Sequence, residues 1–172
     1  MLKYFQKGLL NKKAKAKKRE KTFNNFDTAQ NIGILFDAHN VEDFRLIKKY
    51  TKELKQKNIK CITLGFFNEK EVPDEYLFIS NFSYFNSKDF CILGNPKKRE
   101  ISIFMQEKFD LLLVLSVNEY DQFDIITKLS NAKCIVGKQF EESKYDFNLG
   151  IKEESITNLI DQINHYLSII KK

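Results

Sequence analysis

Residues 109–137 read FDLLLVLSVNEYDQFDIITKLSNAKCIVG, and this stretch decides the fold that the sequence predicts. It opens with Phe109–Val117, an apolar run interrupted by Asp110 and Ser116, which is typical of a parallel strand buried on both faces. Asn118 then predicts the N-cap of a helix that extends to about Ser130. A second, shorter apolar run follows at Lys133–Lys138. Strand, helix and strand in this order indicate a parallel sheet with helices packed on its faces.

The same alternation occurs upstream of this stretch. The runs NIGILFDA (31–38) and IKCITLGFF (59–67) have the length and apolar character of buried strands. Between them, Asn40 predicts the N-cap of an amphipathic helix that ends at about Lys57. The first part of the domain therefore repeats the strand and helix pattern of the middle part.

The remaining segments complete the pattern. Residues 68–95 are rich in aromatic side chains, and they predict one or two short strands. Asn95 and Pro96 predict the cap and the first residue of a further helix. Asp146–Ile151 is predicted as a short edge strand, and Glu153–Ile170 has the apolar spacing of a closing amphipathic helix.

These elements together predict a single α/β domain with a three-layer, Rossmann-like architecture and a mostly parallel sheet of about five strands. The domain is expected to span residues 31–172. A basic amphipathic helix in residues 1–21 precedes it, and the polar residues 22–30 are predicted to link the two. A chain of 172 residues with 42% hydrophobic composition is large enough to bury one core.

Positive charge is concentrated at the start of the chain. The first 21 residues contain nine Lys or Arg and one Glu, a net charge of +8, whereas the other 20 basic and 22 acidic residues leave −2. Leu2, Phe5 and Leu9 recur at helical spacing within this arm, so a basic helix with one apolar side is expected. A positive arm on a nearly neutral body predicts attachment to a polyanion. Structured RNA, such as the ribosome, is the main expectation, in a non-catalytic binding role.

Two basic segments supply the predicted phosphate contacts. They are Lys12, Lys13, Lys15, Lys17, Lys18, Arg19 and Lys21 in the arm, and Lys97, Lys98 and Arg99 after Pro96. The second segment is predicted to lie at a helix N-terminus, which attracts phosphate, although a solvated helix face is the simpler explanation. Three other uses of the arm stay open: an anionic membrane surface, a groove on a partner protein, or a solubilising tail.

A rival hypothesis places function at the carboxyl ends of the strands. Ligands of open parallel sheets bind there, at the point where the strand order reverses. Asp37, His39 and Asn40 follow the first predicted strand, and Asn118 and Glu119 follow the strand at 109–117. A carboxylate beside an imidazole can orient it as a general base, so this crevice predicts a small-molecule-binding or catalytic domain. The alternative is a pair of helix caps and a loop histidine.

Several common chemistries lack their sequence signatures. The chain has no G-x-G-x-x-G, no P-loop and no G-x-S-x-G motif, so no nucleotide cofactor or hydrolase nucleophile is expected. His39 and His165 have no partner at metal-binding spacing, and no metal is expected. Cys61, Cys91 and Cys134 form no disulfide framework, which favours a reducing cytoplasm. No apolar run reaches the length of a transmembrane segment or resembles a signal peptide.

The segments ILFDAHN, SKDFCILGNPKK, KFDLLLVLS and SNAKCIVG, with the basic start, resemble a family of uncharacterised bacterial α/β domains. The resemblance covers most of residues 30–140 and implies the fold without an activity. More distantly, the strand, helix and strand pattern is similar to the N-terminal half of heptosyltransferase-type sugar transferases. Those enzymes bind their nucleotide sugar mainly through a C-terminal Rossmann half, which this sequence does not contain, so a complete transferase is not expected.

Overall fold

The computed structural model describes residues 8, 10–14, 17, 19–67, 74–76, 79–91, 94–141 and 145–170. The strands are β1 (Asn31–Asp37), β2 (Lys60–Phe66), β3 (Phe82–Phe85), β4 (Leu111–Leu115), β5 (Cys134–Lys138) and β6 (Phe147–Leu149). The helices are α2 (Val41–Gln56), α3 (Arg99–Gln106), α4 (Asp121–Leu129) and α5 (Ile156–Ile169), with 3-10 turns at Asp74–Tyr76 and Ser87–Asp89. All six strands are parallel, in the order β3-β2-β1-β4-β5-β6.

The first strand, β1, lies at the centre of the sheet. It pairs with β2 along its whole length and with β4 from Ile32 to Phe36. Every residue of β1 after Asn31 is buried, which explains the continuous apolar run in the sequence. The chain builds the sheet outward from β1 to β3 and then returns to the other side of β1 with β4. The strand order therefore reverses between β1 and β4.

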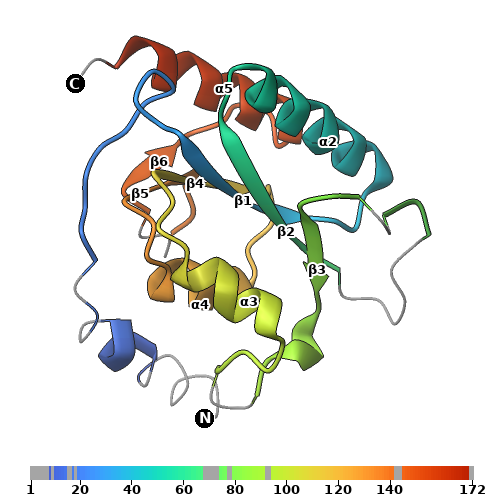
Figure 1. Cartoon of the computed structure of the whole chain (residues 1–172), viewed down its shortest axis with the longest axis vertical. Helices are drawn as coiled ribbons and strands as arrows, with labels where there is room; N and C mark the ends of the chain where they lie inside the picture. Colours follow the sequence, from blue (N-terminus) through green and yellow to red (C-terminus); the bar gives the residue numbers. More distant parts are fainter. Residues whose placement is uncertain are drawn as a thin grey trace.

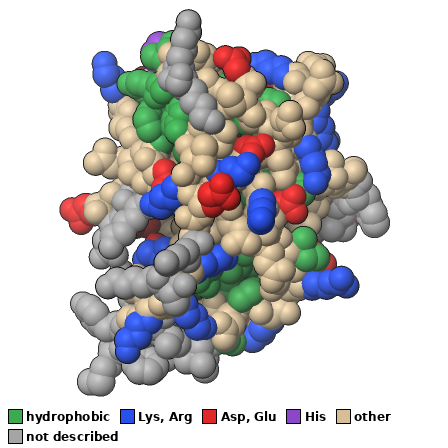
Figure 2. Space-filling model, turned by 60° about the vertical axis from the view of Figure 1, so that its left-hand side comes forward, with side chains coloured by type: hydrophobic (Ala, Val, Ile, Leu, Met, Phe, Trp, Pro, Cys, Tyr) green, Lys and Arg blue, Asp and Glu red, His purple; other side chains and the backbone are tan. Residues whose placement is uncertain are grey.

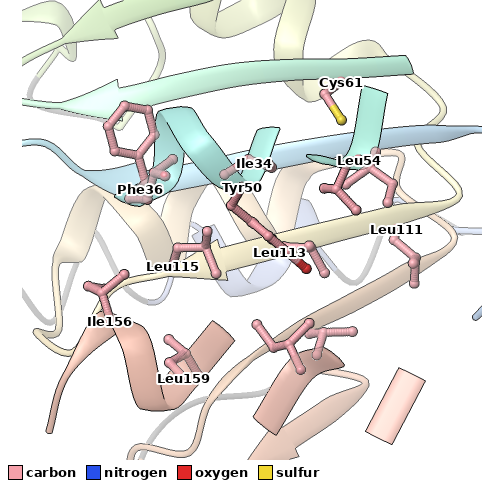
Figure 3. Close-up of a cluster of buried hydrophobic side chains, with 14 of the residues drawn as sticks. Ile34, Phe36, Tyr50, Leu54, Cys61, Leu111, Leu113, Leu115, Ile156 and Leu159 are labelled. Atoms are coloured by element: carbon pink, nitrogen blue, oxygen red, sulfur yellow. The ribbon is translucent and has the colours of Figure 1, made fainter. Parts of the chain in front are cut away.

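Helices cover both faces of the sheet, with α2 and α5 on one side and α3 and α4 on the other (Figure 1). On the first side, the hydroxyl of Tyr50 in α2 donates a hydrogen bond to Asn164 Oδ1 in α5 at 2.8 Å. Figure 3 shows this core, with Ile34, Phe36, Leu113 and Leu115 of the sheet beside Tyr50, Leu54, Ile156 and Leu159 of the helices. The predicted three-layer α/β class is confirmed, with six strands instead of about five.

On the other face of the sheet, which α3 and α4 cover, close packing requires a glycine in β1. Gly33 lies against the ring of Phe109, which is fully buried and packs on Phe104 with ring centroids 4.9 Å apart. A Cβ atom on residue 33 would lie 2.6 Å from two carbons of the Phe109 ring. This distance is too short for two carbon atoms, so glycine is needed here for close packing.

Of three asparagines predicted as helix N-caps, only the one whose side chain binds the helix that follows it is a cap. Asn40 accepts hydrogen bonds from the amides of Glu42 (2.8 Å) and Asp43 (3.1 Å), and it caps α2 as expected. The caps predicted at Asn95 and Asn118 are wrong. The N-cap of α3 is Lys98 and that of α4 is Tyr120, and neither makes a side-chain capping bond. Asn95 and Asn118 bind more distant parts of the chain, described below.

Residues 22–30, predicted as a linker, pack against the body. The amide of Thr22 donates to the carbonyl of Lys133 at 3.2 Å. Asn24 and Asn25 are buried, and their side-chain amides donate to the carbonyls of Asp110 (3.2 Å) and Ile170 (3.0 Å). This segment therefore connects the residue before β4 with the residue after α5.

Replacing Gly33 with Ala is expected to lower the free energy of unfolding by about 1–3 kcal/mol, because the added methyl group overpacks the buried Phe109 ring. Urea denaturation measures this difference. Gly150→Ala is the matched control, since no atom lies within 4 Å of a Cβ at that position. Equal stability of the two variants would contradict the packing argument.

Candidate functional site

A cluster of polar side chains lies where the strand order reverses. Asp37 is the last residue of β1, and Ser116 is the first residue after β4. The Ser116 hydroxyl donates to the carbonyl of Asn118 at 2.7 Å and accepts from the Asn118 amide at 3.1 Å. This tight turn aims the side chain of Asn118 at the neighbouring strand. Asn118 Nδ2 donates to Asp37 Oδ2 at 3.2 Å, although the two residues are 81 positions apart in the sequence.

Asp37 is the centre of the cluster. The Tyr120 hydroxyl donates to Asp37 Oδ2 at 2.6 Å, and the His39 backbone amide donates to Oδ1 at 3.1 Å. The Asp37 side chain is only 12% exposed. Burial opposes the charge of Asp37, but the hydrogen bonds from Tyr120, His39 and Asn118 outweigh it and lower the pKa of the carboxyl group. Burial, together with the Asp37 carboxylate, raises the pKa of the Tyr120 hydroxyl.

The imidazole of His39 is held in one orientation by the carboxylate and by aromatic rings. His39 Nδ1 lies 2.6 Å from Asp37 Oδ1. The imidazole is nearly parallel to the rings of Phe67 and Tyr120, at centroid distances of 5.7 and 6.0 Å, and Phe66 meets it edge-on at 5.4 Å. A carboxylate on Nδ1 fixes the tautomer of a neutral imidazole, so that Nε2 is the nitrogen able to accept a proton. The His39 side chain is 32% exposed.

The predicted crevice residues are only partly brought together. Asp37, His39 and Asn118 form one connected network. Asn40 caps α2 instead, and Glu119 is exposed and makes no hydrogen bond to the network among the residues that the structure describes. Sequence reasoning missed Tyr120. Its hydroxyl lies 2.6 Å from Asp37 Oδ2, the same distance that separates His39 Nδ1 from Asp37 Oδ1. Its position two residues after Asn118, in the same strand-end turn, was the available signal.

The basic arm lies on the body, beside the second predicted basic segment. Residues 10–14 are helical, and Lys13 Nζ donates to Asn95 Oδ1 at 2.6 Å. Figure 1 shows the N-terminal part of the chain passing the β5 and β6 edge of the sheet and ending in this short helical stretch. Leu10 is 9% exposed. Leu2, Phe5 and Leu9, on which the predicted amphipathic face depends, lie outside the described residues, and that face stays a prediction.

An ion pair anchors the arm. Arg19 Nη2 lies 2.5 Å from each carboxylate oxygen of Asp146, and Lys21 Nζ lies 3.0 Å from Oδ1. Arg19 Nη1 also donates to the carbonyl of Ala132 at 3.1 Å. Burial disfavours the charge of Asp146, but hydrogen bonds from Arg19, the Ile135 amide and Lys21 outweigh it and lower the pKa of this carboxyl group. Arg19, predicted to contact phosphate, therefore has its charge engaged within the protein, where its side chain is only 13% exposed.

The other predicted phosphate contacts fall into two groups. Those that donate to an oxygen of the protein are Lys13, Lys17, Arg19 and Lys98, whose acceptors are Asn95, the carbonyl of Leu129, Asp146 and the carbonyl of Tyr84. Those exposed to solvent are Lys12, Lys97 and Arg99, together with Lys21, which also pairs with Asp146. Lys15 and Lys18 lie outside the described residues. In the space-filling view, basic side chains lie on the lower part of the face and alternate with acidic ones across its middle (Figure 2).

Several other kinds of site are not found in the described part of the chain. Its residues form no group of three or more His, Cys, Asp or Glu side chains able to hold a metal ion. None of its helices is both long and apolar enough to cross a bilayer. Burial raises the pKa of the Cys61 thiol to about 11, so this thiol is protonated at neutral pH and is a poor nucleophile.

A parallel sheet of this order, covered by helices on both faces and carrying polar side chains at its reversal point, defines a Rossmann-like α/β domain. The chain belongs to the family of unknown function DUF6913, whose family model matches residues 2–170. No curated protein and no solved structure matches it significantly. The resemblance to uncharacterised α/β domains is thus confirmed, whereas the likeness to heptosyltransferases finds no support.

Replacing Tyr120 with Phe is expected to remove one hydrogen bond from the Asp37 carboxylate and to lower the free energy of unfolding at neutral pH by about 1.5–3 kcal/mol. The folded state holds the pKa of Asp37 below its ordinary value of 3.8, so this stabilisation is present above that value and is lost as the pH falls. The variant raises the pKa of Asp37 toward that value, so its stability should fall less than that of the wild type as the pH is lowered, and the stability difference between the two proteins should shrink in acid.

Urea denaturation across an acidic pH series measures both effects. The matched control is Tyr166→Phe on α5, because the Tyr166 hydroxyl makes no hydrogen bond to any residue in the described ranges. Superimposable pH profiles of the two variants would show that the bond to Asp37 contributes nothing.

Proposed function

We propose that this protein binds structured RNA through a basic surface made by the arm and by the segment that precedes α3. The contact between Lys13 Nζ and Asn95 Oδ1 carries this proposal, because it brings the two basic segments of the sequence to one place. Lys97 and Arg99 follow Asn95 by two and four residues and are exposed. A surface with several cations within a few residues of one another attracts the closely spaced phosphates of nucleic acid.

The cations of this surface differ in how much charge they offer to a ligand. Lys12, Lys13, Lys97 and Arg99 have no carboxylate partner within the described ranges of the chain. Arg19 and Lys21 share the carboxylate of Asp146 and serve mainly to anchor the arm. Lys12, Lys13, Lys97 and Arg99 are therefore the proposed phosphate contacts, and the anchor determines where the first two of them lie.

The position of Leu10 favours RNA over a membrane as the partner. A basic helix that binds a bilayer inserts its apolar side chains into the acyl region. Leu10 belongs to the apolar side of the arm and is 9% exposed in the docked state. Insertion would first require this side chain to leave the body, whereas contact with phosphates requires only the exposed cations.

Binding of the full-length protein to a structured RNA is expected to weaken with salt, because each phosphate contact releases counterions. A variant carrying Lys12→Gln, Lys13→Gln, Lys97→Gln and Arg99→Gln should bind more weakly, and its plot of log affinity against log salt should be shallower by about 3. Fluorescence anisotropy at several salt concentrations measures both quantities. The charge-matched control changes Lys48, Lys49, Lys52 and Lys55, which are exposed on α2, to Gln.

An equal loss of affinity in the control would mean that net charge alone drives binding, and the proposed surface would be wrong. Sedimentation with anionic vesicles, in the absence of RNA binding, would also contradict the proposal and would assign the arm to a membrane.

A second candidate function is the binding of a small polar molecule at the reversal point of the sheet. The observation in its favour is that His39, Asn118 and Tyr120 all contact the single carboxylate of Asp37, at the edge where open parallel sheets bind ligands. In this candidate function, the imidazole of His39 contacts the ligand, and Asp37 is a positioning residue that orients the ring.

Compounds that bind this site should raise the melting temperature of the wild type and of His165→Gln, whose histidine is exposed on α5, but not that of His39→Gln. A thermal-shift screen of small polar compounds tests this expectation. Hits that stabilise all three proteins equally would remove the crevice as a candidate.

A further inference from the structure

A pocket of about 190 Å³ lies at the boundary between the arm and the body. The arm lines it with Lys17, Arg19 and Lys21, and the body lines it with Asp124, Thr127 and Lys128 of α4. Its volume is that of several water molecules. The pocket therefore exists only while the arm is docked, because half of its wall belongs to the arm.

The charges around this pocket do not cancel. Lys128 Nζ lies 2.6 Å from Asp124 Oδ2, and Arg19 and Lys21 share Asp146. Within the described ranges, four cations thus face two carboxylates, which leaves two positive charges in excess. Both excess charges come from the arm, because Arg19 and Lys21 have one acid between them and Lys17 has none among the residues described.

Lys17 is the cation whose charge is least compensated. Its ammonium group donates to the carbonyl of Leu129 at the end of α4, and it has no carboxylate partner among the residues described. Burial lowers the pKa of Lys17, since desolvation disfavours its charged form. An anion in the pocket would accept hydrogen bonds from the remaining N–H groups of this ammonium and stabilise its charge.

We propose that the pocket binds a phosphomonoester group, held by Lys17 from the arm and Lys128 from α4. A phosphomonoester carries a charge of about −1.5 to −2 at neutral pH, and this matches the excess of two positive charges better than the single charge of a phosphodiester does. Its three terminal oxygens can accept hydrogen bonds from several cations at once. The group can come from the 5′ end of an RNA, in which case the inference rests on the proposed function, or from a small phosphorylated compound.

Binding in this pocket is linked to docking of the arm. The ligand contacts both walls, so it binds the docked state and not the undocked one. By linkage, the ligand stabilises the docked arm, and mutations that lower the docked fraction weaken the apparent affinity for the ligand in proportion to that fraction. The ion pair at Asp146 and the bound phosphomonoester therefore both stabilise the docked state of the arm.

Isothermal titration calorimetry of the full-length protein tests the inference. The probes are inorganic phosphate and two oligoribonucleotides of one sequence, ending in a 5′-phosphate or a 5′-hydroxyl. Lys128→Gln is expected to weaken phosphate binding about tenfold or more, because it removes a charge-assisted hydrogen bond. Asp124→Asn should strengthen it, and Lys52→Gln, on the opposite face of the sheet, should leave it unchanged. Circular dichroism of each variant verifies the fold.

Each outcome either supports or overturns phosphate binding in the pocket. Phosphate binding that depends on Lys128, with a preference for the 5′-phosphate RNA, supports an RNA end as the ligand. The same dependence without that preference supports a small phosphorylated compound, and the pocket then stands even if RNA binding fails. Absence of phosphate binding, or equal binding by Lys128→Gln, overturns the inference. Salt-dependent RNA binding that persists in that case leaves the proposed function intact.

Discussion

The parallel pairing of β1 with both β2 and β4 is the constraint on which the rest of the structure depends. A strand with neighbours on both edges and helices on both faces must be apolar along its length. It must also accommodate the side chains that pack on the sheet, and Gly33 provides the space that the Phe109 ring occupies. Because β1 is first in the sequence and central in the sheet, the chain must change direction beside it. That change of direction places Asp37 next to the turn that follows β4.

The strands and the layers could be predicted from the sequence because their signals are local. Apolar runs of strand length and helical stripes depend on neighbouring residues, and these elements formed within a few residues of the predicted bounds. Helix caps show the limit of such reasoning. Asn40 caps the helix that follows it, whereas the side chain of Asn118 binds Asp37 and that of Asn95 binds Lys13. All three asparagines look alike in sequence, and only the fold decides which partner each one meets.

The candidate sites show the same division. Asp37 and His39 are two residues apart, so their contact was predictable, but the contribution of Tyr120 depends on how β4 lies beside β1. The net charge of the arm does not show which of its cations are available to a ligand. Arg19 adds to that charge, although its guanidinium group is paired with Asp146. The charge pattern shows where the cations lie in the sequence, and the fold determines which of them are anchors.

The distance between Arg19 and its anchor also has a consequence for biosynthesis. Asp146 follows Arg19 by 127 residues, so a ribosome working at about 5–20 residues per second makes the carboxylate roughly 6–25 seconds after the guanidinium. During that interval, the nascent arm carries its net charge of +8, with Glu20 as the one acid among its residues 1–21. The first polyanion that the arm meets is therefore the translation machinery, and its docking on the body must compete with that encounter.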